Sequence, residues 1–404
     1  MSEDVLSHSE SSSFRARCRA FLELHATAGD PLTFADNQKF LAAARVAGLA
    51  GIPYAEQYGG AGLTLAHEKI WREEKASFPY ADRMFIISHG MCLPMINEFG
   101  SVEQKERFQA DMIAGRTLWS QLFSEPGAGS DVASLQMTAV RDGDEWVLNG
   151  QKVWTTYAHL SHFGLLIART DASLPKHAGI SMFVVDLKAP GVEVRQINQI
   201  DGGREFNEVY FSDVRVPSDN LVGDVNNGWR LATSMLMYER VTIGSGLSEQ
   251  FAHPFFDILV DGARSQGASV DPIARDEITK IYILETCKSL IGLRTQAEVK
   301  AGKTPGPGGS LGKLFGSVIA WKYRSIAGEI GGLGAVAWED GADPMGALRA
   351  SVVNSFRDGI AGGTDEIQRN IIGDRVLGLP REPVVDRDVP FRELKISTAK
   401  QSSK

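Results

Sequence analysis

One acidic side chain in this chain stands among apolar neighbours at helical spacing. Glu239 has Met235 and Leu236 one turn before it and Thr242 and Ile243 one turn after it. Removing water from around a carboxylate raises its pKa, which is what a general base working near neutral pH requires. A structural ion pair with a distant Lys or Arg would also account for an acid in this place. The residues alone leave both interpretations open.

A glycine-rich turn with hydroxyl groups at both ends is the second chemical feature. In QLFSEPGAGSDVAS (121–134), Ser124 and Ser130 bracket the sequence Pro-Gly-Ala-Gly. Such a turn can expose backbone N–H groups and hydroxyls to a polar ligand. An ordinary surface loop can have the same composition, so this alternative also stays open.

An aromatic residue and a hydroxyl residue alternate along a predicted strand, QKVWTT (151–156). Because side chains in a strand alternate between faces, Trp154 and Thr156 are expected on the same face. Together they could stack on, and hydrogen-bond to, a flat heteroaromatic ring. The alternative is a tryptophan that simply belongs to the core.

Several common catalytic motifs are excluded. Residues 332–337 (GLGAVA) match G-x-G-x-x-A, but the segment before them has a helical pattern, whereas a dinucleotide-binding site needs a strand there. The sequence contains no P-loop, no H-E-x-x-H and no G-x-S-x-G. Its eight histidines lack ligand spacing, so no metal site is expected.

The elements that must position these residues fall into three parts. Apolar residues recur at helical spacing from about 14 to 118, strand patterns fill 121–227, and helical patterns return over 228–264, 273–301, 310–330 and 344–377. Asn149-Gly150 is the strongest local hairpin signal. The predicted fold class is α+β: an N-terminal helical domain (1–120), a middle antiparallel β-sandwich or barrel (121–227), and a C-terminal four-helix bundle (228–404) that ends in a polar, mobile tail from about residue 390.

Composition narrows the classes of protein. The 404 residues carry 42 Lys and Arg against 50 Asp and Glu, a net charge of −8 that argues against duplex nucleic acid as a ligand. The three cysteines are too few, and wrongly spaced, for a disulfide framework or a zinc site. No apolar run is long enough for a membrane span, and the polar N-terminus has no signal-peptide pattern. A cytoplasmic protein is therefore expected.

Six segments, in this order and at this spacing, resemble the acyl-CoA dehydrogenase family. They are GIPYAEQYGGAGL (51–63), LFSEPGAGSD (122–131), NGQKVWTT (149–156), FNEVYFSDVRVP (206–217), ER (239–240) and GGTDEIQRNIIGDRVLGLP (362–380). The resemblance covers nearly the whole chain. It implies an FAD enzyme that dehydrogenates an acyl-CoA thioester between the α- and β-carbons. It also implies a homotetramer, or an α2β2 heterotetramer as in some bacterial members of steroid or long-chain catabolism, with an electron-transfer flavoprotein as acceptor.

The resemblance also assigns roles to individual residues. It implies that four residues line the isoalloxazine ring of FAD, namely Phe123, Ser124, Trp154 and Thr156, with Thr156 near N5. Gly129 and Ser130 would reach the flavin pyrophosphate or the thioester arm of the substrate. Gly332 and Thr364 would contact the adenosine half of FAD. Arg240, which points about 100° away from Glu239 on the helix, is a candidate cation for the anionic substrate.

The catalytic base is the point at which this sequence departs from many members of the family. They carry a Glu immediately before the Gly-Thr of the C-terminal motif, where this chain has Gly362. Members similar to the isovaleryl- and long-chain-type enzymes carry the base on the helix after the β-domain, and that position matches Glu239. The resemblance therefore implies that Glu239 takes the α-proton while flavin N5 takes the β-hydride. Gly362 would keep the backbone N–H that polarises the thioester carbonyl.

Two rival functions are also compatible with this sequence. Where many members have Arg-x-x-Phe-Gly to hold the FAD adenosine half, this chain has ARSQG (263–267). That departure suits an FAD-binding structural subunit of a heteromeric dehydrogenase. A flavin oxygenase or oxidase with the same fold is the other alternative. The absence of Glu at Gly362, beside the small Ala361, predicts a bulky or branched acyl group.

Overall fold

The computed structural model describes residues 6–26, 32–78, 81–244, 254–300, 308–332, 346–381, 383 and 386–394. The chain divides into two compact units. The first comprises Met1–Asn198, Arg204–Tyr238 and Val384–Lys404, and the second comprises Gln199–Gly203 and Glu239–Pro383. Among the described residues, no helix is long and apolar enough to cross a membrane.

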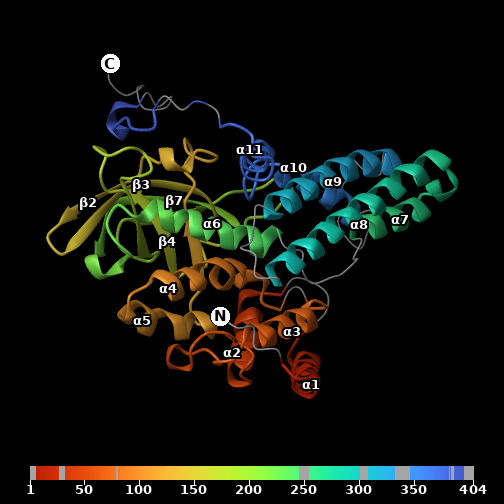
Figure 1. Ribbon diagram of the computed structural model, residues 1–404, viewed down its shortest axis with the longest axis horizontal. Coiled ribbons are helices and arrows are strands. Elements are labelled where there is room, and N and C mark those ends of the chain that lie inside the picture. The colour runs from red at the N-terminus through yellow and green to blue at the C-terminus, as the bar shows by residue number, and fades with distance from the viewer. Residues whose placement is uncertain are drawn as a thin grey trace. The chain divides into compact units, whose positions relative to one another are not determined.

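The first unit begins with five α-helices, which Figure 1 labels in red to orange. They are α1 (His8–His25), α2 (Phe34–Val46), α3 (Leu65–Lys75), α4 (Leu93–Phe99) and α5 (Val102–Ile113). Ser7, Thr33 and Ser101 begin α1, α2 and α5 with capping boxes, in which the cap side chain and the residue three positions later satisfy each other's backbone N–H groups. These local signals explain where the three helices begin, within the N-terminal region that the sequence predicts to be helical.

A mixed eight-stranded sheet follows in the same unit. Its strands are β1 (Trp119–Leu122), β2 (Thr138–Asp142), β3 (Glu145–Thr156), β4 (Phe163–Arg169), β5 (Ile180–Asp186), β6 (Val192–Gln196), β7 (Phe206–Pro217) and β8 (Leu221–Val222). The order is β6-β7-β3-β2-β4-β5-β8, and β1 pairs with β4. Most pairs are antiparallel, as predicted, but β1 and β2 each run parallel to β4, so the expectation of a purely antiparallel sheet is wrong in this part. A parallel pair needs a crossover connection, and the β2–β3 hairpin lies between β1 and β4 in the chain.

Strands β4 and β5 are buried on both faces, which is why their sequences are continuously apolar. On β4, Leu165 and Ile167 pack with the helices, whereas Leu166 and Ala168 pack in the interior of the β-structure. The helix α6 (Gly228–Gly244) contributes Leu231 and Met235 to the same core as the helices. The β-structure is therefore held between its own core and a helical layer.

Asn149-Gly150 does not form the predicted hairpin. β3 runs through both residues, and the hairpin turn lies instead at Asp142–Glu145, between β2 and β3. A register shift occurs between Leu148 and Gly150, where Gly150 has φ +146°. The Asn149 side chain donates to the Asp213 carboxylate and accepts from the Asp213 backbone N–H, both at 2.9 Å. These two bonds join β3 to β7 at the bulge. The same dipeptide chemistry that favours a turn here stabilises a β-bulge.

The second unit is helical. It contains α7 (Pro254–Ser265), α8 (Pro272–Lys300), α9 (Gly308–Gly331), α10 (Gly346–Asp358) and α11 (Asp365–Arg375), with the last residues of α6 at its start. Buried residues from α7, α8 and α9 form one core, against which Val352 of α10 packs, and Figure 1 shows α7, α8 and α9 running side by side. This arrangement confirms the predicted helix bundle.

Two of the long helices predicted from the sequence are each divided in two. The predicted helix over 228–264 becomes α6 and α7, with residues 245–253 outside the described part. The predicted helix over 344–377 becomes α10 and α11. It is interrupted because Gly362 and Gly363 adopt φ values of +67° and +87°, and because Thr364 begins a new helix with its own side-chain cap.

The start of the predicted polar tail is ordered and belongs to the first unit. Phe391 is buried beneath Arg169, whose guanidinium lies 3.6 Å from the ring centroid. Phe391 N–H and Arg392 N–H donate to the Leu174 and Ala172 carbonyls at 2.9 and 3.0 Å. The expectation of a mobile tail from residue 390 is therefore wrong for residues 390–394, and residues 395–404 lie outside the described part.

Candidate active site

The first unit brings the end of β1 against the end of β3. Val153 N–H donates to the Ser124 carbonyl at 2.9 Å, and the Ser120 hydroxyl donates to the Thr156 carbonyl at 2.8 Å. The predicted flavin-lining residues Phe123, Ser124, Trp154 and Thr156 are therefore neighbours in space. Sequence reasoning placed them in one site by resemblance, and these bonds supply the geometry.

Trp154 is not a core residue. Its side chain is 59% exposed, although most large aromatic side chains in this unit are buried. Its indole meets the Phe206 ring edge-on, with centroids 6.1 Å apart, and Phe206 lies directly opposite Thr156 in the β3–β7 register. The prediction that Trp154 and Thr156 share a face assumed simple alternation along a regular strand, and β3 is not regular here. The β3–β7 register shifts between Lys152 and Thr155, and Trp154 has φ +60°.

A buried ion pair ties the glycine-rich turn to β3, and sequence reasoning missed it. Lys152 is fully buried; its ammonium donates to Glu125 at 2.8 Å and to the Phe123 carbonyl at 3.0 Å. Burial lowers the pKa of Lys152, and the Glu125 carboxylate opposes that shift. Glu125 also accepts the backbone N–H groups of Gln136 and Met137. The signal that could have revealed the pair is a Lys at an inward position of a strand, with an acid in the neighbouring motif.

The glycine-rich turn itself presents open backbone. Glu125 and Ala128 exchange two backbone hydrogen bonds of 3.0 Å around Pro126-Gly127. Gly129 and Ser130 follow and are exposed, and a Cβ added to Gly129 would meet no atom within 4 Å. The next residue, Asp131, is held by Lys176 at 3.0 Å. The turn is fixed at both ends, and the exposed Gly129 and Ser130 between them suit contact with a polar ligand.

In the second unit, the predicted base and the predicted carbonyl donor lie together. Oε1 of Glu239 is 3.8 Å from the position that a Cβ would occupy on Gly362. Glu239 is half-buried. The side chain of Arg240, the predicted substrate cation, lies outside the described residues.

The loop that carries Gly362 is held by a buried amide. Gln368 is fully buried, and its Nε2 donates to the Gly362 carbonyl at 2.9 Å and to the Gly363 carbonyl at 3.2 Å. The Thr364 hydroxyl caps α11 by accepting the Ile367 N–H at 3.3 Å. Asp365 accepts from Ser317 at 2.7 Å and from Lys313 at 3.3 Å. Within the described part of the chain, the Gly362 N–H donates to no protein acceptor, so it remains free for a ligand.

The remaining predicted cofactor residue stands apart from this loop in the sequence. Gly332 directly follows the end of α9, has φ +48° and is exposed. The helix before it rules out a strand-based dinucleotide motif, as expected. Among the described residues, no group of three His, Cys, Asp or Glu side chains could hold a metal ion.

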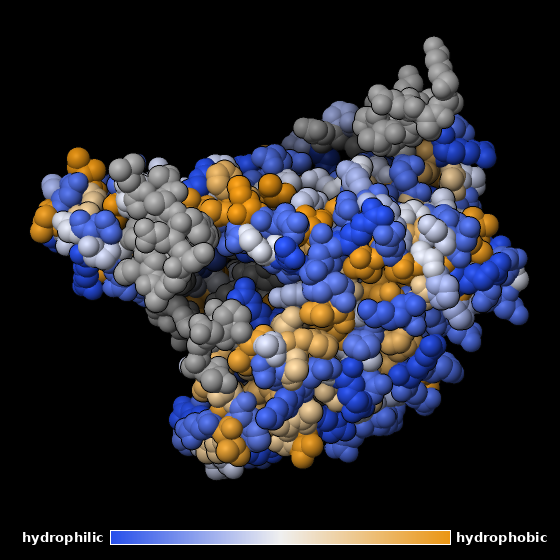
Figure 2. All heavy atoms as spheres, turned by 180° about the vertical axis from the view of Figure 1, so that it is seen from behind, coloured by the Kyte–Doolittle hydropathy of each residue, from blue (hydrophilic) through white to orange (hydrophobic). Residues whose placement is uncertain are grey.

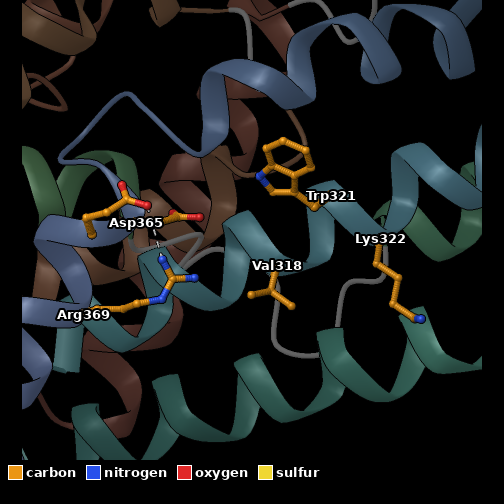
Figure 3. Close-up of a pocket in the computed structure, with 6 residues that line it drawn as sticks. Val318, Trp321, Lys322, Asp365 and Arg369 are labelled. Atoms are coloured by element: carbon orange, nitrogen blue, oxygen red, sulfur yellow. Dashed lines mark ion pairs between the residues drawn. The ribbon is translucent and has the colours of Figure 1, made fainter.

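A shallow hollow of about 560 Å³ lies between α9 and α11. It is lined by Val318, Trp321, Lys322, Asp365, Glu366 and Arg369, none of which the sequence predicted as a site residue. Figure 3 shows Trp321 and Arg369 on different helices of this hollow, with the Lys322 side chain extending away from Asp365. Asp365, the residue after Thr364, lines the hollow, but Glu239 and Gly362 do not.

Comparison with protein families accounts for most of the chain. Residues 8–116 match the acyl-CoA dehydrogenase N-terminal domain, residues 120–214 its middle domain, and residues 226–377 its C-terminal domain. The chain belongs to the acyl-CoA dehydrogenase family. The family assignment and the α+β fold class predicted from the sequence are confirmed.

Individual relatives agree with this membership. Acyl-CoA dehydrogenase IpdE1 of Mycobacterium tuberculosis is 38% identical over 346 residues, which cover 86% of this chain and 88% of the relative. The solved structure of the ChsE4-ChsE5 complex from Mycobacterium tuberculosis has a TM-score of 0.75 and 27% identity, covering 94% of this chain and 100% of the other. The structure described as the Tcur3481-Tcur3483 steroid ACAD has the same TM-score, with 25% identity and coverage of 94% and 100%.

The acyl-CoA dehydrogenase is thus an oxidoreductase whose cofactor is FAD. The residues present fit that cofactor. An exposed indole on a fixed strand end beside the Thr156 hydroxyl suits a flat, polar ring, and the open Gly129–Ser130 backbone suits a phosphate. These contacts remain predictions at the level of single residues.

Proposed function

We propose that this acyl-CoA dehydrogenase uses Glu239 to remove the α-proton of a bulky acyl-CoA thioester. The observation that carries the proposal is the 3.8 Å between Glu239 Oε1 and the Cβ position of Gly362. A base at residue 362 and the carboxylate of Glu239 would occupy neighbouring space, so Glu239 can serve a substrate held at the Gly362 loop.

We assign the steps of binding and catalysis to separate groups of the chain. Glu239 takes the α-proton, and the Gly362 N–H donates to the thioester oxygen on which negative charge develops. Phe123, Ser124, Trp154 and Thr156 hold the flavin ring, while Gly129 and Ser130 bind a phosphate or the thioester arm. Gly332 and Thr364 bind the adenosine half of the cofactor, and Arg240 meets the anionic substrate. FAD supplies the acceptor for the hydride that leaves the β-carbon.

The substrate class follows from the space at the loop and from the relatives. Residues 361–363 are Ala-Gly-Gly, which leaves room beside the base where larger side chains would intrude. A solved relative is described as a steroid ACAD. We therefore expect a branched or ring-bearing acyl chain, such as a steroid side chain, to react better than a short straight one. Flavin bleaching with a panel of acyl-CoA esters tests this order.

The test of the base is Glu239→Gln. The variant is expected to keep its bound FAD and its yellow colour, but to lose at least about a hundredfold in the rate at which acyl-CoA bleaches the flavin. Glu106→Gln, an exposed acid-to-amide change on α5, is the matched control and should bleach at the wild-type rate. Bleaching by the Glu239 variant at the wild-type rate would show that another group is the base.

The bundle carries apolar side chains that suit subunit contacts. Trp321, Phe356, Ile360 and Leu377 are each at least 44% exposed, and Figure 2 shows hydrophobic patches among hydrophilic residues on one face. A tetramer, either of this chain alone or with a second, different chain, would cover such residues. The ChsE4-ChsE5 complex is a two-component relative, which favours the heteromeric form.

Light scattering of the purified chain, alone and co-expressed with a candidate partner, distinguishes the two assemblies. A yellow tetramer from one chain supports the homotetramer. A colourless, inactive chain that gains FAD only with a partner would support the structural-subunit alternative instead. We expect electrons to leave to an electron-transfer flavoprotein, and slow reoxidation of the reduced flavin by O₂ would argue against an oxidase.

A further inference from the structure

The segment Trp154–Tyr157 holds an unfavourable backbone conformation. Trp154 has φ +60° and Tyr157 has φ +53°, in a region that residues with a Cβ rarely adopt. Two such residues within four positions persist only when the surrounding structure fixes them. The contacts that hold this segment therefore bear on function, because Trp154 and Thr156 are the proposed flavin contacts.

We propose that Asn207 on β7 is a positioning residue for the FAD site, whose buried amide locks the Trp154–Tyr157 segment in the shape that presents Trp154 and Thr156. The proposal rests on the FAD contacts in the proposed function. Asn207 acts through this segment and not by contact with the cofactor.

The contacts of Asn207 reach both sides of the segment. Its Nδ2 donates to the Thr155 carbonyl at 2.8 Å and to the Glu205 carbonyl at 3.0 Å. The same Glu205 carbonyl accepts the Tyr157 N–H at 2.7 Å. One amide group thus joins the carbonyl between Trp154 and Thr156 to the acceptor that holds Tyr157.

The orientation of the Asn207 amide follows from its partners. Two carbonyls can only accept, so the NH₂ group must face them, and Oδ1 faces His159 Nδ1 at 3.0 Å. Asn207 is fully buried, so water cannot replace these bonds. An aspartate of the same size would place a negative charge against two carbonyl oxygens and could not donate to either.

A second buried group holds the next carbonyl along. Ser120 is fully buried, and its hydroxyl donates to the Thr156 carbonyl at 2.8 Å while lying 2.6 Å from the Ser161 hydroxyl. The carbonyls of Thr155 and Thr156 are thus pinned by side chains from β7 and β1. The strained segment is fixed by specific bonds and not only by general packing.

The variants Asn207→Asp and Asn207→Ala, with Ser120→Ala as an independent arm, test the proposal in the full-length protein. For each, we would measure the FAD dissociation constant, the visible absorption and circular dichroism of the bound flavin, and the thermal midpoint. Asn220→Ala is the matched control. Asn220 is a buried asparagine of the same unit whose Nδ2 donates to the unstrained Val184 carbonyl at 2.9 Å.

Both Asn207 variants are expected to raise the FAD dissociation constant about tenfold, equivalent to about 1.4 kcal/mol, and to change the visible dichroism of the flavin. Ser120→Ala should change the visible dichroism of the flavin in the same direction. This variant can still test the proposal if the Asn207 variants do not fold. Asn220→Ala should lower the thermal midpoint without changing either flavin property. The proposal would be overturned if the folded Asn207 variants had wild-type FAD affinity and flavin dichroism. If the Asn207 variants do not fold, the same result in Ser120→Ala would overturn it.

Trp154→Ala separates this result from a failure of the proposed function. If that variant leaves FAD affinity and dichroism unchanged, the assumed FAD contact is wrong, and the inference about Asn207 falls with it. If Trp154→Ala alters them and the Asn207 and Ser120 variants do not, the proposed function stands and only the role of Asn207 is wrong.

Discussion

Glu239 Oε1 lies 3.8 Å from the point at which a Cβ would stand on Gly362. The two residues are 123 positions apart in the sequence, on α6 and on the loop before α11. An acid on the helix therefore reaches the space into which a side chain at residue 362 would project. This relationship supports the proposal that Glu239, and not residue 362, supplies the base.

Adding a methyl group at each glycine of the loop should separate their roles. At Gly362 the new Cβ would meet Glu239 at an ordinary contact distance, whereas at Gly363 it would stand 2.6 Å from Gln368 Nε2. Both residues have positive φ, so each alanine adds strain of about 1–2 kcal/mol. We expect Gly362→Ala to fold and to lose activity mainly toward bulky acyl groups, and Gly363→Ala to lose more stability. Thermal midpoints and kcat/KM for a large and a small acyl-CoA measure both effects, and equal midpoints for the two variants would contradict this ranking.

Removing the donors of Gln368 should disturb the Gly362 loop without removing any group that touches substrate. Gln368→Leu loses the bonds to the Gly362 and Gly363 carbonyls, and Gln368→Glu adds a negative charge beside both. A displacement of about 1 Å in such a loop can cost a hundredfold in rate. We expect kcat to fall in both variants, and to fall further in Gln368→Glu than in Gln368→Leu. KM should change little in either variant. A change confined to KM, or none at all, would remove Gln368 from this role.

The buried pair of Lys152 and Glu125 predicts a stability effect. Lys152→Met leaves the Glu125 carboxylate buried without its cation, which costs about 3–5 kcal/mol in the free energy of unfolding. Lys152→Met with Glu125→Gln should recover part of this loss, because the amide is neutral and its oxygen still accepts a backbone N–H. Urea unfolding measures both variants. A single variant within about 0.5 kcal/mol of the wild type would mean that the pair contributes no net stability.

The buried imidazole of His89 should make the protein less stable in mild acid. Burial lowers its pKa, although the bond of 2.8 Å from Nε2 to the Met112 carbonyl and the charge of Asp82 oppose the shift. Below the unfolded value of about 6.5, the unfolded chain takes up a proton that the folded chain does not. Stability should therefore fall as the pH drops from about 6.5 toward the lowered folded pKa. His89→Gln keeps a donor for Met112 and should flatten the change in thermal midpoint between pH 7.5 and 5.5, whereas exposed His8→Gln should not.

Local patterns in the sequence predicted the helical regions, but not every helix boundary, since the predicted helices over 228–264 and 344–377 are each divided in two. Ser101 begins α5 with a capping box, which depends on residues only three positions apart. The strand patterns predicted over 121–227 hold for β4 and β5, whose continuous apolar runs are buried. Asn149-Gly150 failed as a hairpin because a turn and a bulge use the same residues, and only the pairing with Asp213 on another strand selects the bulge.

The candidate site divides in the same way. Residue types, order and spacing alone identified the family and pointed to Glu239, Gly362, Trp154 and Thr156. Only the tertiary structure decided that Glu239 and Gly362 are neighbours, that Lys152 and Glu125 form a buried pair, and that Asn207 and Gln368 hold the backbone at the two candidate regions. These contacts join residues far apart in the chain, and a sequence read by local pattern carries no information about which distant carbonyl a buried amide will meet.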